Sequence, residues 1–173
     1  MSLFDFMNFN ESKIVGGIAA YIVKEMLEEA GYFVYAFGYE KSLPSLAKNR
    51  LLKDAKDKDI ADKIRCMPDL LVVDPEGNAF VVEVKFRSHQ RIDYNLKRKV
   101  LEIDKHWPRA KLLMAYPVWP YFRISTIKDL ARTGELYDLY KDRFLNVNKE
   151  LVEQYGRQIK KYLGKQKKDI AGS

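Results

Sequence analysis

Apolar residues recur at helical spacing near the start of the chain, in the segment between Ser12 and Gly31. Serine is a preferred N-cap and glycine suits the position after a helix end, so we expect one amphipathic helix with these bounds. Its first half collects small residues at positions 16, 17, 19 and 20. Because glycine weakens a helix interior by up to about 1 kcal/mol relative to alanine, this cluster predicts a close approach, most simply tight packing on a sheet.

Extended segments follow this helix. Residues 32–39 are rich in aromatic residues and valine, and residues 70–73 and 79–86 are apolar, β-branched runs, so we expect three strands. The last two runs are separated by Asp-Pro-Glu-Gly-Asn. Proline presets φ, and glycine and asparagine tolerate positive φ, so these five residues predict a hairpin turn.

A basic segment at 42–65 separates the first strand from the hairpin, and its weak helical periodicity predicts one or two helices. Its charged residues most simply form a solvated face; the alternative is a basic flap over a substrate. A further helix is predicted from Ile92 to Pro108, where proline ends it. Strands are predicted at 111–116 and 121–124.

Two helices complete the C-terminal part: a short one capped by Ser125 or Thr126, and a last one capped by Asn148. The order of elements predicts an α/β fold in which a mixed sheet is flanked by helices, with extra C-terminal helices. A chain of 173 residues is most simply one domain. We divide this single domain, 1–173, into a core at 11–125, a helical insertion at 42–65, a C-terminal helical extension at 126–164 and a flexible tail at 165–173.

The composition is that of a folded, basic protein, with 47% hydrophobic residues and a formal net charge of +7. This charge favours an anionic partner such as nucleic acid. The segment after Ser88 is strongly basic, and its alternative interpretation is a solvated helix face. The candidate phosphate contacts are Arg87, Arg91, Lys97 and Arg98.

A single cysteine, Cys66, excludes an intramolecular disulfide and a cysteine zinc cluster. No apolar run approaches the roughly 20 residues that span a bilayer, and the N-terminus lacks the pattern of a signal peptide. We therefore expect a soluble cytoplasmic protein without a membrane partner.

The hairpin brings together the residues with the clearest chemistry. If Val73 pairs with Ala79 across the turn, Asp69 falls opposite Glu83, and Lys85 shares the face of Glu83. Two opposed carboxylates need a positive charge between them, and Mg²⁺ is typically held by one or two carboxylates plus substrate phosphate. The alternative is a solvent-facing Glu–Lys pair, and a register shift of one residue would put Asp69 on the other face.

Pro68-Asp69 followed by Glu83-Val84-Lys85 resembles the signature of the PD-(D/E)xK nuclease superfamily, whose restriction-endonuclease-like fold has an αβββαβ core. Within it, the chain is most similar to archaeal-type Holliday junction resolvases, over 13–40 and 67–85 and more loosely over 111–125. The resemblance implies a homodimeric, Mg²⁺- or Mn²⁺-dependent endonuclease acting on branched or duplex DNA. It also implies that Asp69, Glu83 and the backbone carbonyl of Val84 are metal ligands and that Lys85 is the catalytic lysine.

The chain departs from this family at Ala20, which occupies the position of the usual first-helix glutamate. Either another acid replaces it, with Glu40 favoured over Glu11 and Glu25, or the chain is a catalytically inactive DNA-binding module on the same fold. The segment 42–65 is also longer than a resolvase connection. A protein-interaction subunit is the third hypothesis. His89, near Lys85 in sequence, is a candidate for indirect support of the site.

Overall fold

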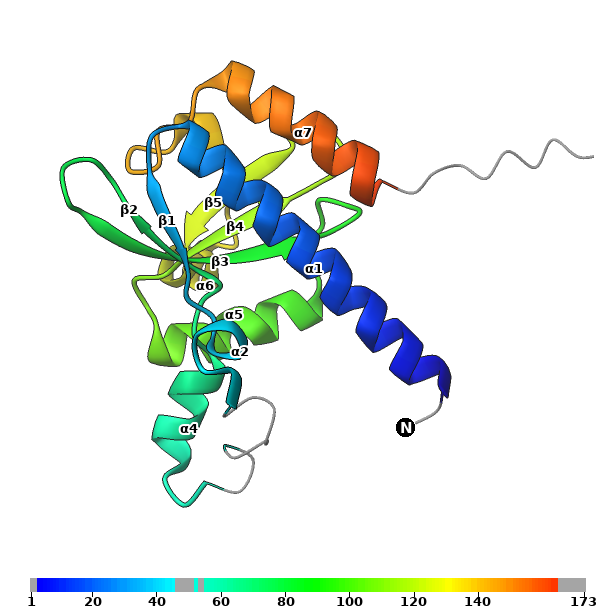
Figure 1. The fold of residues 1–173 in the computed structure, drawn as a ribbon, viewed down its shortest axis with the longest axis vertical. Coiled ribbons are helices and arrows are strands. Elements are labelled where there is room, and N and C mark those ends of the chain that lie inside the picture. The colour runs from blue at the N-terminus through cyan, green and yellow to red at the C-terminus, as the bar shows by residue number, and fades with distance from the viewer. Residues whose placement is uncertain (1–2, 46–51, 53–54, 165–173) are drawn as a thin grey trace, which may run out of the picture.

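The computed structural model describes residues 3–45, 52 and 55–164. Its centre is a six-stranded mixed sheet in which the strands lie in chain order (Figure 1). Only β3 and β4 are parallel, and the other neighbours are antiparallel. This confirms the predicted α/β fold with a mixed sheet. The strands are β1 (Phe33–Ala36), β2 (Leu70–Val73), β3 (Ala79–Phe86), β4 (Lys111–Ala115), β5 (Phe122–Thr126) and β6 (Tyr137–Asp138).

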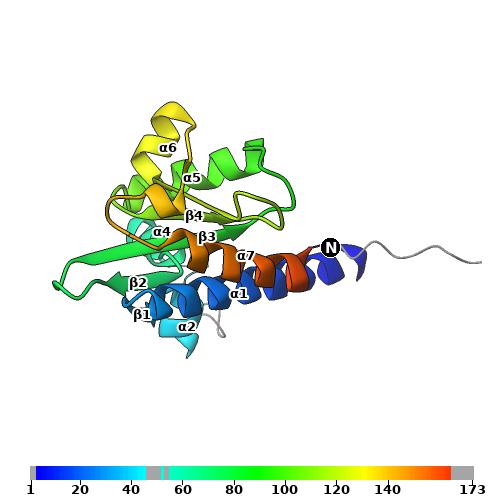
Figure 2. The same ribbon diagram turned by 90° about the horizontal axis from the view of Figure 1, so that it is seen from above.

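Helices cover both faces of the sheet (Figure 2). On one face α1 (Leu3–Glu29) lies beside α7 (Lys149–Leu163), and on the other α5 (Tyr94–His106) packs on α6 (Ile127–Thr133). Alternate strand residues divide the core into two layers, because successive side chains point to opposite faces. Thus Val82 and Leu113 pack under α1 and α7, whereas Leu112 and Met114 pack under α5 and α6.

The hairpin has the predicted register. Val73 pairs with Ala79, and the ladder continues in steps to Leu70 opposite Val82. In the turn, Asp74 accepts hydrogen bonds from the backbone and side chain of Asn78, and Gly77 has a φ of 90°. The turn residues therefore fix the pairing of the two strands, as their sequence predicts.

Three helix ends have a predicted capping residue. Gly31, with a φ of 95°, ends α1, and the Tyr32 N–H donates to the carbonyl of Leu27 as in a Schellman motif. Thr126, rather than Ser125, caps α6, and Asn148 caps α7. The predicted start of α1 at Ser12 is wrong, since the helix already begins at Leu3.

The segment between β1 and the hairpin contains two described helices, α2 (Tyr39–Ser42) and α4 (Lys58–Arg65). The rest of the predicted insertion, at 46–51 and 53–54, lies outside the described residues, as does the predicted tail at 165–173. The predicted strand 32–39 is shorter than expected, because Tyr39 already belongs to α2.

Trp107 anchors α4 to the end of α5. Its indole N–H donates to the carbonyl of Lys63 at 3.1 Å, and the Lys63 ammonium lies 5.8 Å from the ring centroid. Phe37, directly after β1, meets the same ring edge-on at 5.7 Å. Trp107 therefore contributes to the attachment of the insertion to the core.

The predicted C-terminal helical extension contains a strand. After α6, β6 adds a sixth strand through Tyr137, and the 3₁₀ helix η1 (Leu139–Lys141) follows it. A strand of two residues is too short to leave a period-two pattern in the sequence. None of the described helices is both long and apolar enough to cross a membrane.

The glycines of α1 and α7 have opposite surroundings. A Cβ at Gly17 would meet nothing within 4 Å, so the predicted close packing there is wrong, although Ala19 and Ala20 are buried. A Cβ at Gly156 would overlap the ring of Tyr121. A glycine is therefore required at position 156 in α7 but not at position 17 in α1.

These surroundings predict substitutions of opposite sign. Gly156→Ala should lower the free energy of unfolding by about 1–3 kcal/mol through overpacking. Gly17→Ala should raise it by about 0.5–1 kcal/mol, because alanine favours the helix and fills open space. Urea denaturation of both variants beside the wild type checks the pair, and a stabilising Gly156→Ala would contradict the packing described.

A partly buried hydrogen bond between α1 and α7 predicts a pH dependence of stability. The Tyr155 hydroxyl donates to Glu29 Oε2 at 2.7 Å, and burial, together with this carboxylate, raises the pKa of Tyr155 from 10.0 to about 12. A raised acid pKa means that the folded state holds the proton more tightly. This contribution is therefore complete below pH 10 and is lost as the pH rises through about 12.

Tyr155→Phe should accordingly lower the free energy of unfolding by about 2 kcal/mol at neutral pH. The difference from wild type should shrink between pH 10 and pH 12. Tyr162→Phe, at an exposed position of the same helix, is the matched control and should have little effect. A deficit for Tyr155→Phe that stays constant through this range would contradict the assigned hydrogen bond.

Candidate active site

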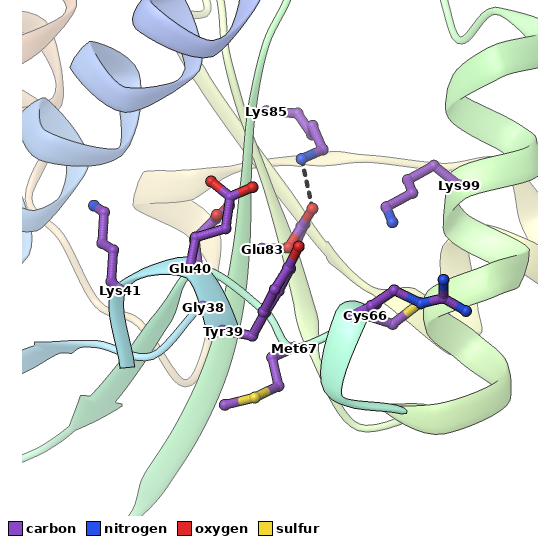
Figure 3. A pocket seen from close by; sticks show the side chains of 11 residues that line it. Gly38, Tyr39, Glu40, Lys41, Cys66, Met67, Glu83, Lys85 and Lys99 are labelled. Carbon is purple, nitrogen blue, oxygen red and sulfur yellow. Dashed lines mark ion pairs between the residues drawn. The ribbon is translucent and has the colours of Figure 1, made fainter. Parts of the chain in front are cut away.

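An open cavity of about 230 Å³ lies where α2, α4, β3 and α5 converge (Figure 3). Both carboxylates and amines line it. Its lining residues are Gly38, Tyr39, Glu40, Lys41, Arg65, Cys66, Met67, Asp69, Glu83, Lys85 and Lys99. The predicted pair of Asp69 and Glu83 therefore shares one cavity with Lys85, and the two carboxylates do not lie on opposite faces of the sheet.

Asp69 is held from two sides at the start of β2. Its backbone carbonyl accepts from the Phe37 N–H at 2.9 Å and from the Gly38 N–H at 3.3 Å. Its carboxylate Oδ2 accepts from the Val84 N–H at 2.8 Å. These contacts fix both the main chain and the side chain of Asp69 between β1 and β3.

Pro68 leaves the Val84 carbonyl without a ladder hydrogen bond from the start of β2. Continuing the observed register by two residues places Pro68 opposite Val84. Proline has no N–H to donate, so it offers no ladder hydrogen bond to the Val84 carbonyl. The N–H and C=O of one strand residue point to the same side, and the Val84 carbonyl therefore points toward the side of Asp69, which binds the Val84 N–H.

Glu83 is a buried charge paired with Lys85. The Glu83 side chain is only 6% exposed, whereas that of Lys85 is 28% exposed, and Oε1 lies 2.5 Å from Nζ. Burial raises the pKa of Glu83 above its ordinary value, and the charge of Asp69 raises it further while Lys85 lowers it. Burial alone would lower the pKa of Lys85, but the carboxylates of Glu83 and Asp69 outweigh it and the pKa is raised.

Lys99 is a functional candidate that the sequence analysis did not single out. It extends from α5 toward the Glu83–Lys85 pair (Figure 3). Along α5 it lies beside the buried positions Leu96, Val100 and Ile103. The sequence places Lys99 at the border of the buried stripe, one turn from Leu96 and Ile103, but it does not show which cavity the side chain faces.

Of the acids proposed to replace the first-helix glutamate, Glu40 lines the cavity from α2 (Figure 3) and pairs with Lys13 at 3.1 Å. Glu25 lies elsewhere on α1, next to Lys24. The side chain of Glu11 lies outside the described part of the chain. Ala20, on α1, is 5% exposed and packs in the core between this helix and the sheet, without lining the cavity.

The predicted phosphate contacts lie outside the cavity. Arg91, Lys97 and Arg98 are exposed, and Arg87 is half-buried, with its Nε 3.7 Å from Asp93. His89 does not line the cavity either; its Nδ1 accepts from the Arg91 N–H at 3.3 Å. These side chains lie on the loop and helix that follow β3. Their contribution to nucleic-acid binding stays a prediction.

The oxygen atoms at the cavity suit a hard divalent cation. Within residues 3–45, 52 and 55–164, no three side chains among His, Cys, Asp and Glu form a ready-made metal site. The two carboxylates fit Mg²⁺, which keeps several water ligands and is usually bound by one or two carboxylates. Val84, the third predicted ligand, does not line the cavity, although its carbonyl points toward the side of Asp69. Cys66 also lines the cavity, and burial raises the pKa of its thiol, which disfavours the thiolate form that binds metals.

No protein-family model matches the sequence, and no curated protein matches it significantly. The functional conclusion therefore rests on the cavity and its chemistry.

Proposed function

We propose that this protein is a metal-dependent DNA endonuclease with a restriction-endonuclease-like core. One observation carries the proposal: Asp69 and Glu83, from adjoining strands, line one cavity with the amine of Lys85 beside them. This set combines oxygen ligands for a divalent cation with a positive group that can contact a phosphate. Net charge +7 favours a nucleic acid as the substrate.

In this proposal Asp69, Glu83 and the carbonyl of Val84 hold Mg²⁺ or Mn²⁺. The bound ion supplies Lewis acidity, which favours hydroxide over water and neutralises charge on the scissile phosphate. Lys85 donates hydrogen bonds to the phosphate oxygens as negative charge develops on them. Water adds to phosphorus, the bond to the leaving oxygen breaks, and the products are a phosphate monoester and a hydroxyl end.

Glu40 takes the place of the missing first-helix acid in this proposal. It reaches the same cavity from α2 rather than from α1. Its carboxylate is paired with Lys13 at 3.1 Å. Glu40 would supply a further carboxylate oxygen to the metal site, as the first-helix glutamate does in the nucleases that the chain resembles.

The second candidate is a catalytically inactive DNA-binding module on the same fold. The observation that favours it is Ala20, a buried methyl group where the related nucleases carry a carboxylate. Such a module would keep the basic helix α5 and its phosphate contacts. It would bind DNA without metal and would not hydrolyse it.

Cleavage assays separate the two candidates. A four-way junction, a linear duplex and a single strand, all end-labelled, are incubated with the protein and rising Mg²⁺, with EDTA as the control. The nuclease predicts Mg²⁺-dependent cleavage of at least one substrate. Tight binding without cleavage at any Mg²⁺ or Mn²⁺ concentration would contradict it and support the binding module.

The oligomeric state tests the resolvase-like form of the proposal. Symmetric cleavage of two strands at a four-way junction requires two active sites, so a junction resolvase should be a homodimer. Sedimentation equilibrium of the full chain measures its mass against 20.3 kDa for one chain. A strictly monomeric protein that still cuts DNA would favour a nuclease that acts on one strand at a time.

A further inference from the structure

We propose that Lys99 binds a backbone phosphate of the nucleic acid inside the cavity, and that it positions the strand before the metal arrives. The inference rests on the proposed nucleic-acid substrate. It assigns to the cavity a phosphate contact distinct from the exposed basic groups of the loop and helix after β3.

The first argument is the direction of the side chain. Lys99 is half-buried and lines the cavity, whereas its neighbours Lys97 and Arg98 are exposed and do not. Figure 3 shows its amine extending from α5 toward Glu83 and Lys85. Its ion pair with Glu102, at 3.7 Å, lies on the helix surface, where such pairs are weak. The amine is therefore available to a ligand.

The second argument is charge. Without a bound metal ion, Asp69 and Glu83 place two negative charges at the cavity, and Lys85 neutralises only one of them. These three side chains alone therefore carry a net negative charge, which repels a phosphodiester. Two other cations, Lys41 and Arg65, also line the cavity, but both are exposed and Arg65 is paired with Asp62. Lys99 is half-buried and balances the remaining charge, since Glu40 is paired with Lys13. Binding of a phosphate group before the metal thus depends on Lys99.

The third argument is the shape of the cavity. Trp107 fixes α4 beside the end of α5, which places Arg65 on the rim of the same cavity as Lys99. Arg65 is itself paired with Asp62 through its guanidinium. A cavity of about 230 Å³ with amines on its wall suits a sugar–phosphate segment rather than a stacked base pair. Lys99 therefore recognises the backbone and not the sequence.

Cys66, the single cysteine, provides a reporter in the cavity. Its alkylation by iodoacetamide is followed by mass spectrometry in EDTA, with and without a short duplex, and separately with inorganic phosphate. Each variant is compared with itself with and without ligand, because the charge of Lys99 lowers the pKa of the Cys66 thiol and changes its basal rate. Lys99→Met is the test, and Lys128→Met, at an exposed position of α6, is the matched control.

The duplex should slow alkylation of the wild type and of Lys128→Met, and this protection should disappear in Lys99→Met. Affinity for the duplex should fall about tenfold in Lys99→Met, and the slope of log affinity against log salt should decrease by about one. Unchanged protection in a folded Lys99→Met would overturn the inference. Equal protection by inorganic phosphate would overturn the assignment to a nucleic-acid strand.

These outcomes are separable from those of the proposed function. Protection that depends on Lys99, in a protein that never cuts DNA, would support this inference and contradict the nuclease. Mg²⁺-dependent cleavage together with full protection of Cys66 in Lys99→Met would support the nuclease and contradict this inference. Lys99→Gln is the second variant if the methionine variant has a lower melting temperature than wild type.

Discussion

Glu83→Gln should reduce Mg²⁺-dependent DNA cleavage by about a thousandfold while leaving the fold intact. Glutamine keeps the size of the side chain but loses the charge, and a neutral amide is a poor ligand for a hard cation. The position is only 4% exposed, so a matched shape matters for packing. Single-turnover cleavage at saturating Mg²⁺ measures the effect on the chemical step.

The control for this variant is Glu76→Gln, in the exposed turn of the same hairpin, which should cut DNA like the wild type. DNA binding in EDTA should not weaken in Glu83→Gln, because the change removes a negative charge from the cavity. Cleavage within tenfold of wild type would contradict the assignment of Glu83 as a metal ligand.

Lys85→Met should slow cleavage by about a hundredfold or more, because it removes the positive group that stabilises charge on the phosphate. It should also destabilise the metal-free protein, by roughly 3 kcal/mol, since Glu83 loses the partner 2.5 Å away and stays buried. Lys128→Met, far from the cavity on α6, should change neither quantity. Single-turnover rates and urea denaturation in EDTA measure the two effects.

A double variant separates the structural and chemical roles of Lys85. In Lys85→Met with Glu83→Gln, the buried charge is gone, so the stability lost in the single variant should largely return. Cleavage should stay absent. If the loss in the free energy of unfolding in the double variant equals the sum of the losses in the two single variants, Lys85 and Glu83 are not energetically coupled.

The hairpin shows how much of the site could be predicted from the sequence. Its turn residues fix the pairing of Val73 with Ala79, and counting from there places Asp69 opposite Glu83. Side-chain alternation then puts Lys85 on the same face. These are local consequences of backbone geometry, and the observed cavity contains all three side chains.

The walls of the cavity could not be predicted, because they depend on contacts between distant segments. Trp107 binds the carbonyl of Lys63, and this contact sets where α4 ends and where Arg65 lies. Lys99 joins the site because α5 packs across the sheet in one particular orientation. Neither packing distance nor orientation is encoded in a sequence window around these residues.

The errors at α1 have a similar origin. Ser12 has the chemistry of an N-cap, but the helix continues through it from Leu3. Propensity at a single position is a weak signal in comparison with the continuation of a helix. Gly17 suggested close packing, yet no atom lies within 4 Å of its missing Cβ, because that side of α1 faces away from the sheet.

The most direct measurement is a calorimetric titration of Mn²⁺ into the wild type, Asp69→Asn and Glu83→Gln. We predict one saturable site per chain in the wild type and its loss in each of the two variants. Undiminished Mn²⁺ binding in both variants, or no binding by the wild type, would contradict a cation held between the two strands.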